Sequence, residues 1–130
     1  MAKTPLHGSV GYNFVEDLRQ EIADGYDINE ADETGFTPLH SACLSNSYEA
    51  AKVLLDEGAD MGRQDQRGNT PLSYVVKNNE NSLRMVTLLV EYGADPTIEN
   101  NKGTSPLALA QRTQKSDYLA VFGINDLPVG

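Results

Sequence analysis

Hydrophobic residues along this chain recur with the spacing of short amphipathic helices. Leu54 and Leu55 follow Ala51 by three and four positions, so a helix through them would place the three side chains on one face. The same spacing returns further along the chain at Val86, Leu89 and Val90. Each stretch begins after a short polar break and runs to a glycine, which predicts a series of short helices.

These stretches belong to an internal repeat. The proline motif is Thr-Pro-Leu-His, Thr-Pro-Leu-His, Thr-Pro-Leu and Ser-Pro-Leu, and its successive copies are 33, 33 and 35 residues apart. The copies stand at residues 4–7, 37–40, 70–72 and 105–107. A glycine follows the first three prolines by 20, 20 and 22 residues. The two additional residues of the third unit are expected at 78–81.

Each repeated residue has a physical role at its position. Proline is tolerated in the first turn of a helix, and the threonine before it can cap the helix, which predicts a helix from Pro38 to about Leu44. A glycine in the left-handed conformation is expected to end each second helix. The Asp-x-x-Gly segments that precede the prolines predict tight turns between units. The helix-ending glycines are Gly25, Gly58 and Gly93.

With these motifs the chain resembles the ankyrin repeat family. It matches the family's Asp-x-x-Gly-x-Thr-Pro-Leu-His-x-Ala pattern and its Leu-Leu-x-x-Gly-Ala-Asp close from residue 2 to about 122. The resemblance implies an all-α repeat solenoid, an L-shaped stack of helix pairs linked by β-hairpin-like turns. It predicts one domain over residues 1–130, with repeats at about 1–31, 32–64, 65–99 and 100–122 and a tail at 123–130. The first and last repeats are expected to act as caps.

The net charge of −9 comes from 19 acidic and 10 basic side chains and is concentrated in one half of the chain. Residues 1–60 carry 12 acidic and three basic groups, whereas residues 61–130 carry seven of each. This charge argues against nucleic acid or an anionic membrane as the main partner, since phosphates repel it. A single cysteine and the lack of a visible secretory signal favour a reducing, cytoplasmic location.

The chemistry-bearing residues favour structural roles over catalysis. The family resemblance gives His7 and His40 hydrogen bonds to the motif threonine and nearby backbone, and no partner base or pocket is visible in the sequence. Cys43 is expected to be a buried, inert thiol rather than a nucleophile. The acidic stretch 24–33 fails the calcium-loop pattern, because Ala31 stands at a ligand position. The sequence therefore predicts no enzyme activity, no metal site and no cofactor.

Binding to another protein remains, and the resemblance implies that it uses the concave surface of turn tips and inner helices. Large apolar groups there would be the energetic anchors, because such side chains dominate interface energies. Phe36 either packs on its own hairpin or contacts the partner, Leu44 either caps its helix or contacts the partner, and Tyr74 is favoured as a contact. The candidate partner-binding residues are Tyr12, Glu33, Phe36, Leu44, Arg67, Asn69, Tyr74, Lys77, Lys102 and Arg112.

The predicted function is a non-enzymatic protein–protein interaction module. By analogy with small acidic ankyrin proteins, it is a small inhibitor or immunity-type protein; the alternative is an adaptor that bridges two proteins. The acidic residues of the first two units either form a solvated cap or steer a partner with a basic patch. The chain alone is expected to be a monomer.

Overall fold

The computed structural model describes Leu6, residues 15–77 and residues 82–123. Within these residues the secondary structure consists of seven helices and contains no strand. The helices are α2 (Val15–Ala23), α3 (Pro38–Leu44), α4 (Tyr48–Asp56), α5 (Pro71–Lys77), α6 (Leu83–Glu91), α7 (Pro106–Arg112) and α8 (Ser116–Val121). The expectations for Tyr12, His7, the additional residues at 78–81 and the tail beyond Gly123 lie outside the described residues.

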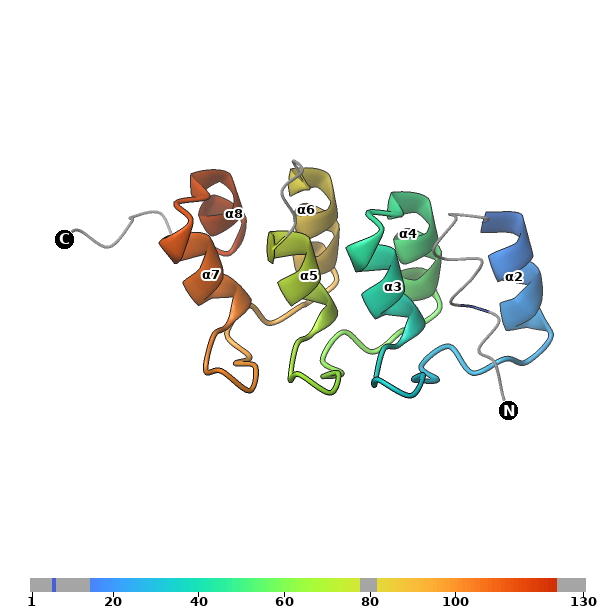
Figure 1. Ribbon diagram of the computed structural model, residues 1–130. Coiled ribbons are helices and arrows are strands. Elements are labelled where there is room, and N and C mark those ends of the chain that lie inside the picture. The colour runs from blue at the N-terminus through green and yellow to red at the C-terminus, as the bar shows by residue number, and fades with distance from the viewer. Residues whose placement is uncertain (1–5, 7–14, 78–81, 124–130) are drawn as a thin grey trace.

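The helices form two layers in one stack, as Figure 1 shows. The inner layer consists of α3, α5 and α7, which pack on one another in order, and the outer layer of α2, α4, α6 and α8 does the same. Each inner helix packs on the outer helix that follows it, and the turns that precede α3, α5 and α7 all project to one side of the stack. The predicted all-α repeat solenoid is thereby confirmed.

The inner helices begin where the proline motifs predict. Helix α3 spans Pro38–Leu44, and the hydroxyl of Thr37 accepts the amide of His40 at 3.3 Å. Helix α7 is capped in the same way by Ser105, whose hydroxyl accepts the amide of Ala108 at 3.1 Å. A side-chain oxygen at this position satisfies an amide that has no partner inside the helix.

The outer helices end at the predicted glycines. Gly58 has φ of 92°, and the amide of Ala59 returns to the carbonyl of Leu54 at 2.9 Å, which closes the last turn. Gly25 and Gly93 have φ of 97° and 102°. A residue with a Cβ adopts this left-handed conformation only at a cost, so glycine determines where each outer helix stops.

The core lies between the two layers and consists of the predicted apolar faces. Ala51, Leu54 and Leu55 of α4 are all buried. Towards the first repeat the outer layer becomes polar: Gln20 of α2 is exposed, whereas Val53, at the equivalent position of α4, is buried. An exposed polar side chain on the outer face is what a terminal repeat requires.

The Asp-x-x-Gly segments form the predicted tight turns. In the third repeat, one carboxylate oxygen of Asp65 accepts the amides of Arg67 and Asn69 at 3.0 and 2.9 Å. The amide of Gly68 donates to the Asp65 carbonyl at 2.9 Å, and Gly68 has φ of 81°. The aspartate side chain therefore holds the turn from inside.

Neighbouring turns are also joined to each other. The amide of Gln66 donates to the carbonyl of Thr34 at 2.9 Å, and the amide of Asn101 donates to the carbonyl of Arg67 at 3.0 Å. The turns approach so closely that a Cβ added to Gly68 would lie 2.7 Å from the Asn101 nitrogen. These contacts fix the turn tips relative to one another along the stack.

Candidate partner-binding surface

Residues of the turn tips and of the inner helices α3 and α5 lie together on one surface of the stack, the one that the family resemblance assigns to a partner. Leu44, the last residue of α3, is 53% exposed. The charged candidates that the sequence placed here are all exposed, namely Glu33, Arg67, Lys77, Lys102 and Arg112. Together with Leu44 and half-buried Phe36, seven of the ten predicted residues thus keep exposed side-chain surface.

Two hollows lie side by side on this surface. The first, of about 360 Å³, lies between the second and third repeats, and the second, of about 460 Å³, lies between the third and fourth. The first is lined by Thr34, Phe36, Leu44, Asp65, Gln66, Arg67 and Tyr74. The second is lined by Gln66, Arg67, Asn69, Lys77, Asn100, Asn101 and Lys102. Glu33 and Arg112 line neither hollow.

The expectation that Tyr74 is an exposed anchor is wrong. Tyr74 is only 8% exposed, and its hydroxyl donates to the carboxylate of Asp65 and accepts the side-chain amide of Asn69. Burial, and then the hydrogen bond to Asp65, raise the pKa of Tyr74 above its ordinary value of 10.0. Tyr74 lines the first hollow, while its hydroxyl holds the turn before α5.

Asn69 is likewise buried and corrects the expectation of a turn-tip contact. It is 3% exposed, and its side-chain oxygen accepts the amide group of Asn100 at 2.9 Å. Its amide nitrogen donates to the hydroxyl of Tyr74 at 3.3 Å. Asn69 therefore connects α5 to the turn of the fourth repeat, through its side-chain nitrogen and its side-chain oxygen.

Phe36 packs within the stack, and its side chain also lines the first hollow. Its ring stacks on the imidazole of His40, with centroids 5.1 Å apart and an interplanar angle of 28°. It also lies 5.2 Å from the ring of Tyr74 in the next repeat. The half-buried side chain packs across two repeats and still lines the first hollow.

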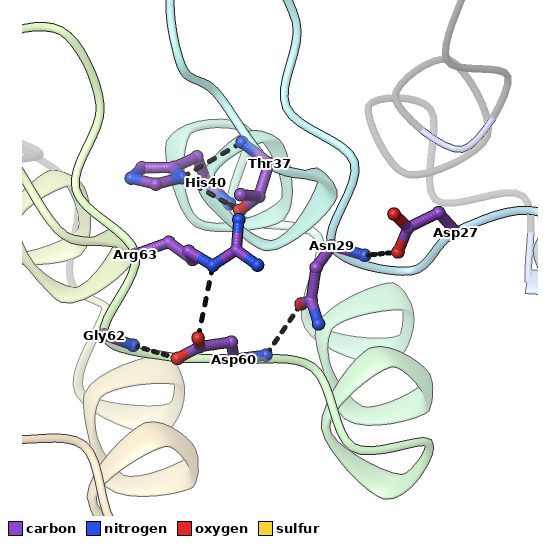
Figure 2. A network of polar contacts seen from close by, with 7 residues as sticks. All are labelled: Asp27, Asn29, Thr37, His40, Asp60, Gly62 and Arg63. Carbon is purple, nitrogen blue, oxygen red and sulfur yellow. Dashed lines mark hydrogen bonds and ion pairs between the residues drawn. The ribbon is translucent and has the colours of Figure 1, made fainter.

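His40 has the structural role that the family resemblance implies. Its Nδ1 accepts the amide of Thr37 at 3.1 Å, as Figure 2 shows, so the ring proton must be on Nε2. Nε2 in turn donates to the carbonyl of Asn69 at 2.8 Å. The fully buried imidazole thus caps α3 and binds the second repeat to the third, with both ring nitrogens engaged.

The second hollow is cationic. Three basic side chains line it, Arg67, Lys77 and Lys102, and no acidic residue does. The ammonium group of Lys77 lies 5.7 Å from the centroid of the Tyr74 ring, within the range of a cation–π contact. The structure therefore brings together three cations that the sequence places on two different repeats.

Five lining residues are not among the ten candidates: Thr34, Gln66 and Asn101, which stand at turn tips of the repeat pattern, and Asp65 and Asn100, which were not expected to line a hollow. Asp65 and Asn100 both occupy the first position of the turn motif, where the side chain was expected only to shape the turn. Asn100 accepts the amides of Lys102 and Thr104 at 2.9 and 3.0 Å, as Asp65 does in its own turn. The signal was available, since a residue at this position lies beside the turn tip of its own repeat.

The remaining candidates for chemistry lie away from this surface. Cys43 is buried, and burial raises the pKa of its thiol far above the ordinary value. Within the described ranges, no group of three or more His, Cys, Asp or Glu side chains could hold a metal ion.

The acidic stretch 24–33 serves loop structure where it meets the following repeat. Asp27 accepts the amide of Asn29 at 2.9 Å, and the Asn29 side chain accepts the amide of Asp60 at 2.8 Å, as Figure 2 shows. Asp60 in turn accepts from the amide of Gly62 and from Arg63 Nε. These bonds join the loops after α2 and α4.

None of the helices in the described part of the chain has the length and apolar character needed to span a bilayer.

Comparison with known proteins agrees with the fold. A search of curated proteins returned no match. A family model described as ankyrin repeats (3 copies) matches residues 1–65 and 52–122, which together cover nearly the whole chain. The helix pairs, the stacked turns and this match show that the chain belongs to the ankyrin repeat family.

Proposed function

We propose that this chain is a non-enzymatic module that binds another protein through its concave surface, and that it acts as a small inhibitor or immunity-type protein by covering its partner. Ankyrin repeats generally mediate protein–protein interaction. The observation that carries the proposal is Leu44, which is 53% exposed at the edge of a hollow that Phe36 also lines. An exposed aliphatic group beside a hollow lined by aromatic side chains offers apolar surface that a partner side chain can bury.

A binding role is favoured over catalysis by how the reactive side chains are used. His40 is fully buried and employs both ring nitrogens in hydrogen bonds to Thr37 and Asn69. The thiol of Cys43 is buried and its raised pKa keeps it protonated. A general base needs a free nitrogen within reach of a substrate, and a nucleophile needs access to one.

The experiment is affinity purification from an extract of the organism that encodes the chain, followed by mass spectrometry. We compare the wild type with Leu44→Arg, which places a charged side chain at the edge of the first hollow. The matched control is Tyr26→Arg, because Tyr26 is 47% exposed and lies in the loop after α2. We expect the partner to be lost with Leu44→Arg and retained with Tyr26→Arg. Equal recovery with all three proteins would contradict the use of the concave surface.

An adaptor is the second candidate, and the acidic outer side favours it. Exposed carboxylates line α2 and the end of α4, at Glu16, Asp17, Asp56 and Glu57. They line neither of the two hollows and would suit a second partner with a basic patch. Size-exclusion chromatography with light scattering separates the candidates, since an inhibitor forms a binary complex and an adaptor a ternary one. The same measurement tests whether the free chain is a monomer.

The proposal places the protein in the cytoplasm. The one cysteine is buried as a free thiol, which suits a reducing compartment. Fractionation of cells that express a tagged chain tests this, and recovery in a secreted fraction would contradict it.

A further inference from the structure

The two hollows on the concave surface are continuous in their lining but opposite in character. Gln66 and Arg67 line both of them, so one ligand can occupy both at once. The first offers the apolar side chains of Phe36 and Leu44 and the ring of Tyr74. The second offers three cations and side-chain amides.

The cations of the second hollow are notable because the chain as a whole carries a charge of −9. Among the described residues, no acidic side chain forms an ion pair with Arg67, Lys77 or Lys102. Like charges gathered at one place repel each other, and a ligand carrying negative charge relieves that repulsion. The charge of this hollow is therefore available to a partner.

The first hollow, by contrast, has no excess of cations, because Asp65 and Arg67 both line it. Asp65 lines it, and this carboxylate already receives the Tyr74 hydroxyl and the amides of Arg67 and Asn69. A second carboxylate beside it would be repelled, whereas an apolar side chain could pack on Phe36 and Leu44. The surface therefore distinguishes the two ends of a ligand.

We propose that the concave surface binds an extended protein segment in which an apolar side chain is followed or preceded closely by carboxylates. The apolar side chain occupies the hollow between the second and third repeats. The carboxylates meet the cations between the third and fourth repeats. This inference rests on the proposed protein-binding function and adds the chemistry and the orientation of the partner segment.

A short acidic segment fits better than a nucleic acid. A polyanion would be repelled by the acidic residues of the first two repeats, including exposed Glu33 at the neighbouring turn tip. One or two carboxylates need only the attraction of the cations that line the second hollow, because charges farther away are screened by salt. The first hollow also favours the binding of an apolar side chain, and a phosphate backbone does not supply one.

The backbone that presents two of the cations is held in place before any partner arrives. The amides of Arg67 and Lys102 donate to the side chains of Asp65 and Asn100 at 3.0 and 2.9 Å. The carbonyl of Arg67 accepts the amide of Asn101 at 3.0 Å. Preorganised turns lower the conformational cost of binding, which favours a specific site over diffuse attraction.

The test is selection of a random peptide library, displayed on phage, against the full chain. We expect the selected peptides to combine an apolar residue with nearby Asp or Glu. Their affinity should fall at least about tenfold with Arg67→Glu or Lys102→Glu, and should weaken as salt is raised. Arg19→Glu is the matched control, since it changes the net charge equally at an exposed position of α2, and it should leave the affinity unchanged.

Several outcomes would overturn the inference. They are selection of basic or uncharged peptides, selection of none, an equal loss with Arg19→Glu, or stronger binding of a single-stranded DNA oligonucleotide than of the peptides. Circular dichroism of each variant shows whether the fold is kept, which is expected because these side chains are exposed.

The native partner separates this inference from the proposed function. If Leu44→Arg abolishes capture of that partner but Arg67→Glu and Lys102→Glu do not, the acidic-segment inference fails and the protein-binding function stands. If none of the three variants changes capture, both fail.

Discussion

The second and third repeats begin with the same Thr-Pro-Leu motif and the same tight turn, but they hold their inner helices with different side chains. In the second repeat, His40 caps α3 and donates to the Asn69 carbonyl of the next repeat at 2.8 Å. In the third, Ser73 replaces the histidine and only its hydroxyl meets that of Thr70, at 3.3 Å. In the third repeat it is the hydroxyl of Tyr74 that holds the turn, by hydrogen bonds to Asp65 and Asn69.

This difference explains which side chains remain for a partner. In the second repeat the imidazole of His40 is fully buried, and Leu44 at the end of α3 is 53% exposed. The third repeat uses its large aromatic residue to hold Asp65 and Asn69, so Tyr74 has little surface to offer. The hydroxyl of Tyr74 thus serves the turn before α5, although Asp65 also accepts the amides of Arg67 and Asn69.

The largest expected effect is that of His40→Ala. The substitution leaves a cavity and removes the partners of the Thr37 amide and the Asn69 carbonyl, so we expect a loss of about 3–4 kcal/mol in the free energy of unfolding. Ser73→Ala, at the equivalent position, should lose less than about 1 kcal/mol, because it removes one weak hydroxyl contact. Urea denaturation measures both, and equal losses would show that the two repeats are held alike.

The turns provide the second contrast. A Cβ at Gly68 would meet the Asn101 backbone nitrogen at 2.7 Å, whereas at Gly103 nothing lies within 4 Å. Both glycines have left-handed φ, of 81° and 77°. Gly103→Ala should therefore lose only the conformational term of about 1 kcal/mol, and Gly68→Ala about 2–3 kcal/mol in total because the stacked turns must separate. Thermal unfolding of the two variants tests this, and an inverted order would contradict the close stacking.

Tyr74→Phe isolates the hydroxyl from the ring. The aromatic contacts with Phe36 and His40 remain, while the donor to Asp65 is lost, so we expect a destabilisation of about 1–2 kcal/mol. The affinity for a partner should change much less than with Leu44→Ala, which should cost about 1–2 kcal/mol of binding and little stability. If Tyr74→Phe instead reduces affinity alone, the tyrosine is an interface residue after all.

The smallest expected effect is a pH dependence in the alkaline range. The pKa of Tyr74 is raised above 10.0 in the folded chain, first by burial and then by its bond to Asp65. As pH rises past about 10 the unfolded chain loses this proton first, so the free energy of unfolding falls. Denaturation between neutral pH and the alkaline limit should show a decline that Tyr74→Phe makes shallower. Tyr92→Phe should change the decline less, because Tyr92 is exposed and its pKa is raised by a solvent-screened bond to Asp56.

Much of the fold could be predicted from local signals. Thr37 and Pro38 mark the start of a helix, Gly58 marks the end of the next, and the spacing of Leu54 and Leu55 marks its buried face. These residues act on their own backbone or on neighbours a few positions away. A pattern that repeats every 33 residues then implies stacking, because each unit alone cannot bury its apolar face.

The exposure of individual side chains on the concave surface could not be predicted in the same way. Asn69 and Tyr74 occupy positions that face the partner side in the repeat pattern, yet both are buried. Their burial depends on Asp65 and Asn100, which reach them from two turns. A repeat template does not include such side-chain bonds between units.

The sequence by itself determined the family, the helix boundaries and the concentration of acidic charge in the first 60 residues, since each follows from the order of residues along the chain. Only the tertiary structure decided that Arg67, Lys77 and Lys102 share one hollow and that Leu44, rather than Tyr74, is the exposed apolar group. The physical reason is that helix caps and turns depend on local backbone bonds, whereas a surface is formed by side chains from adjacent repeats that compete for the same hydrogen-bonding partners.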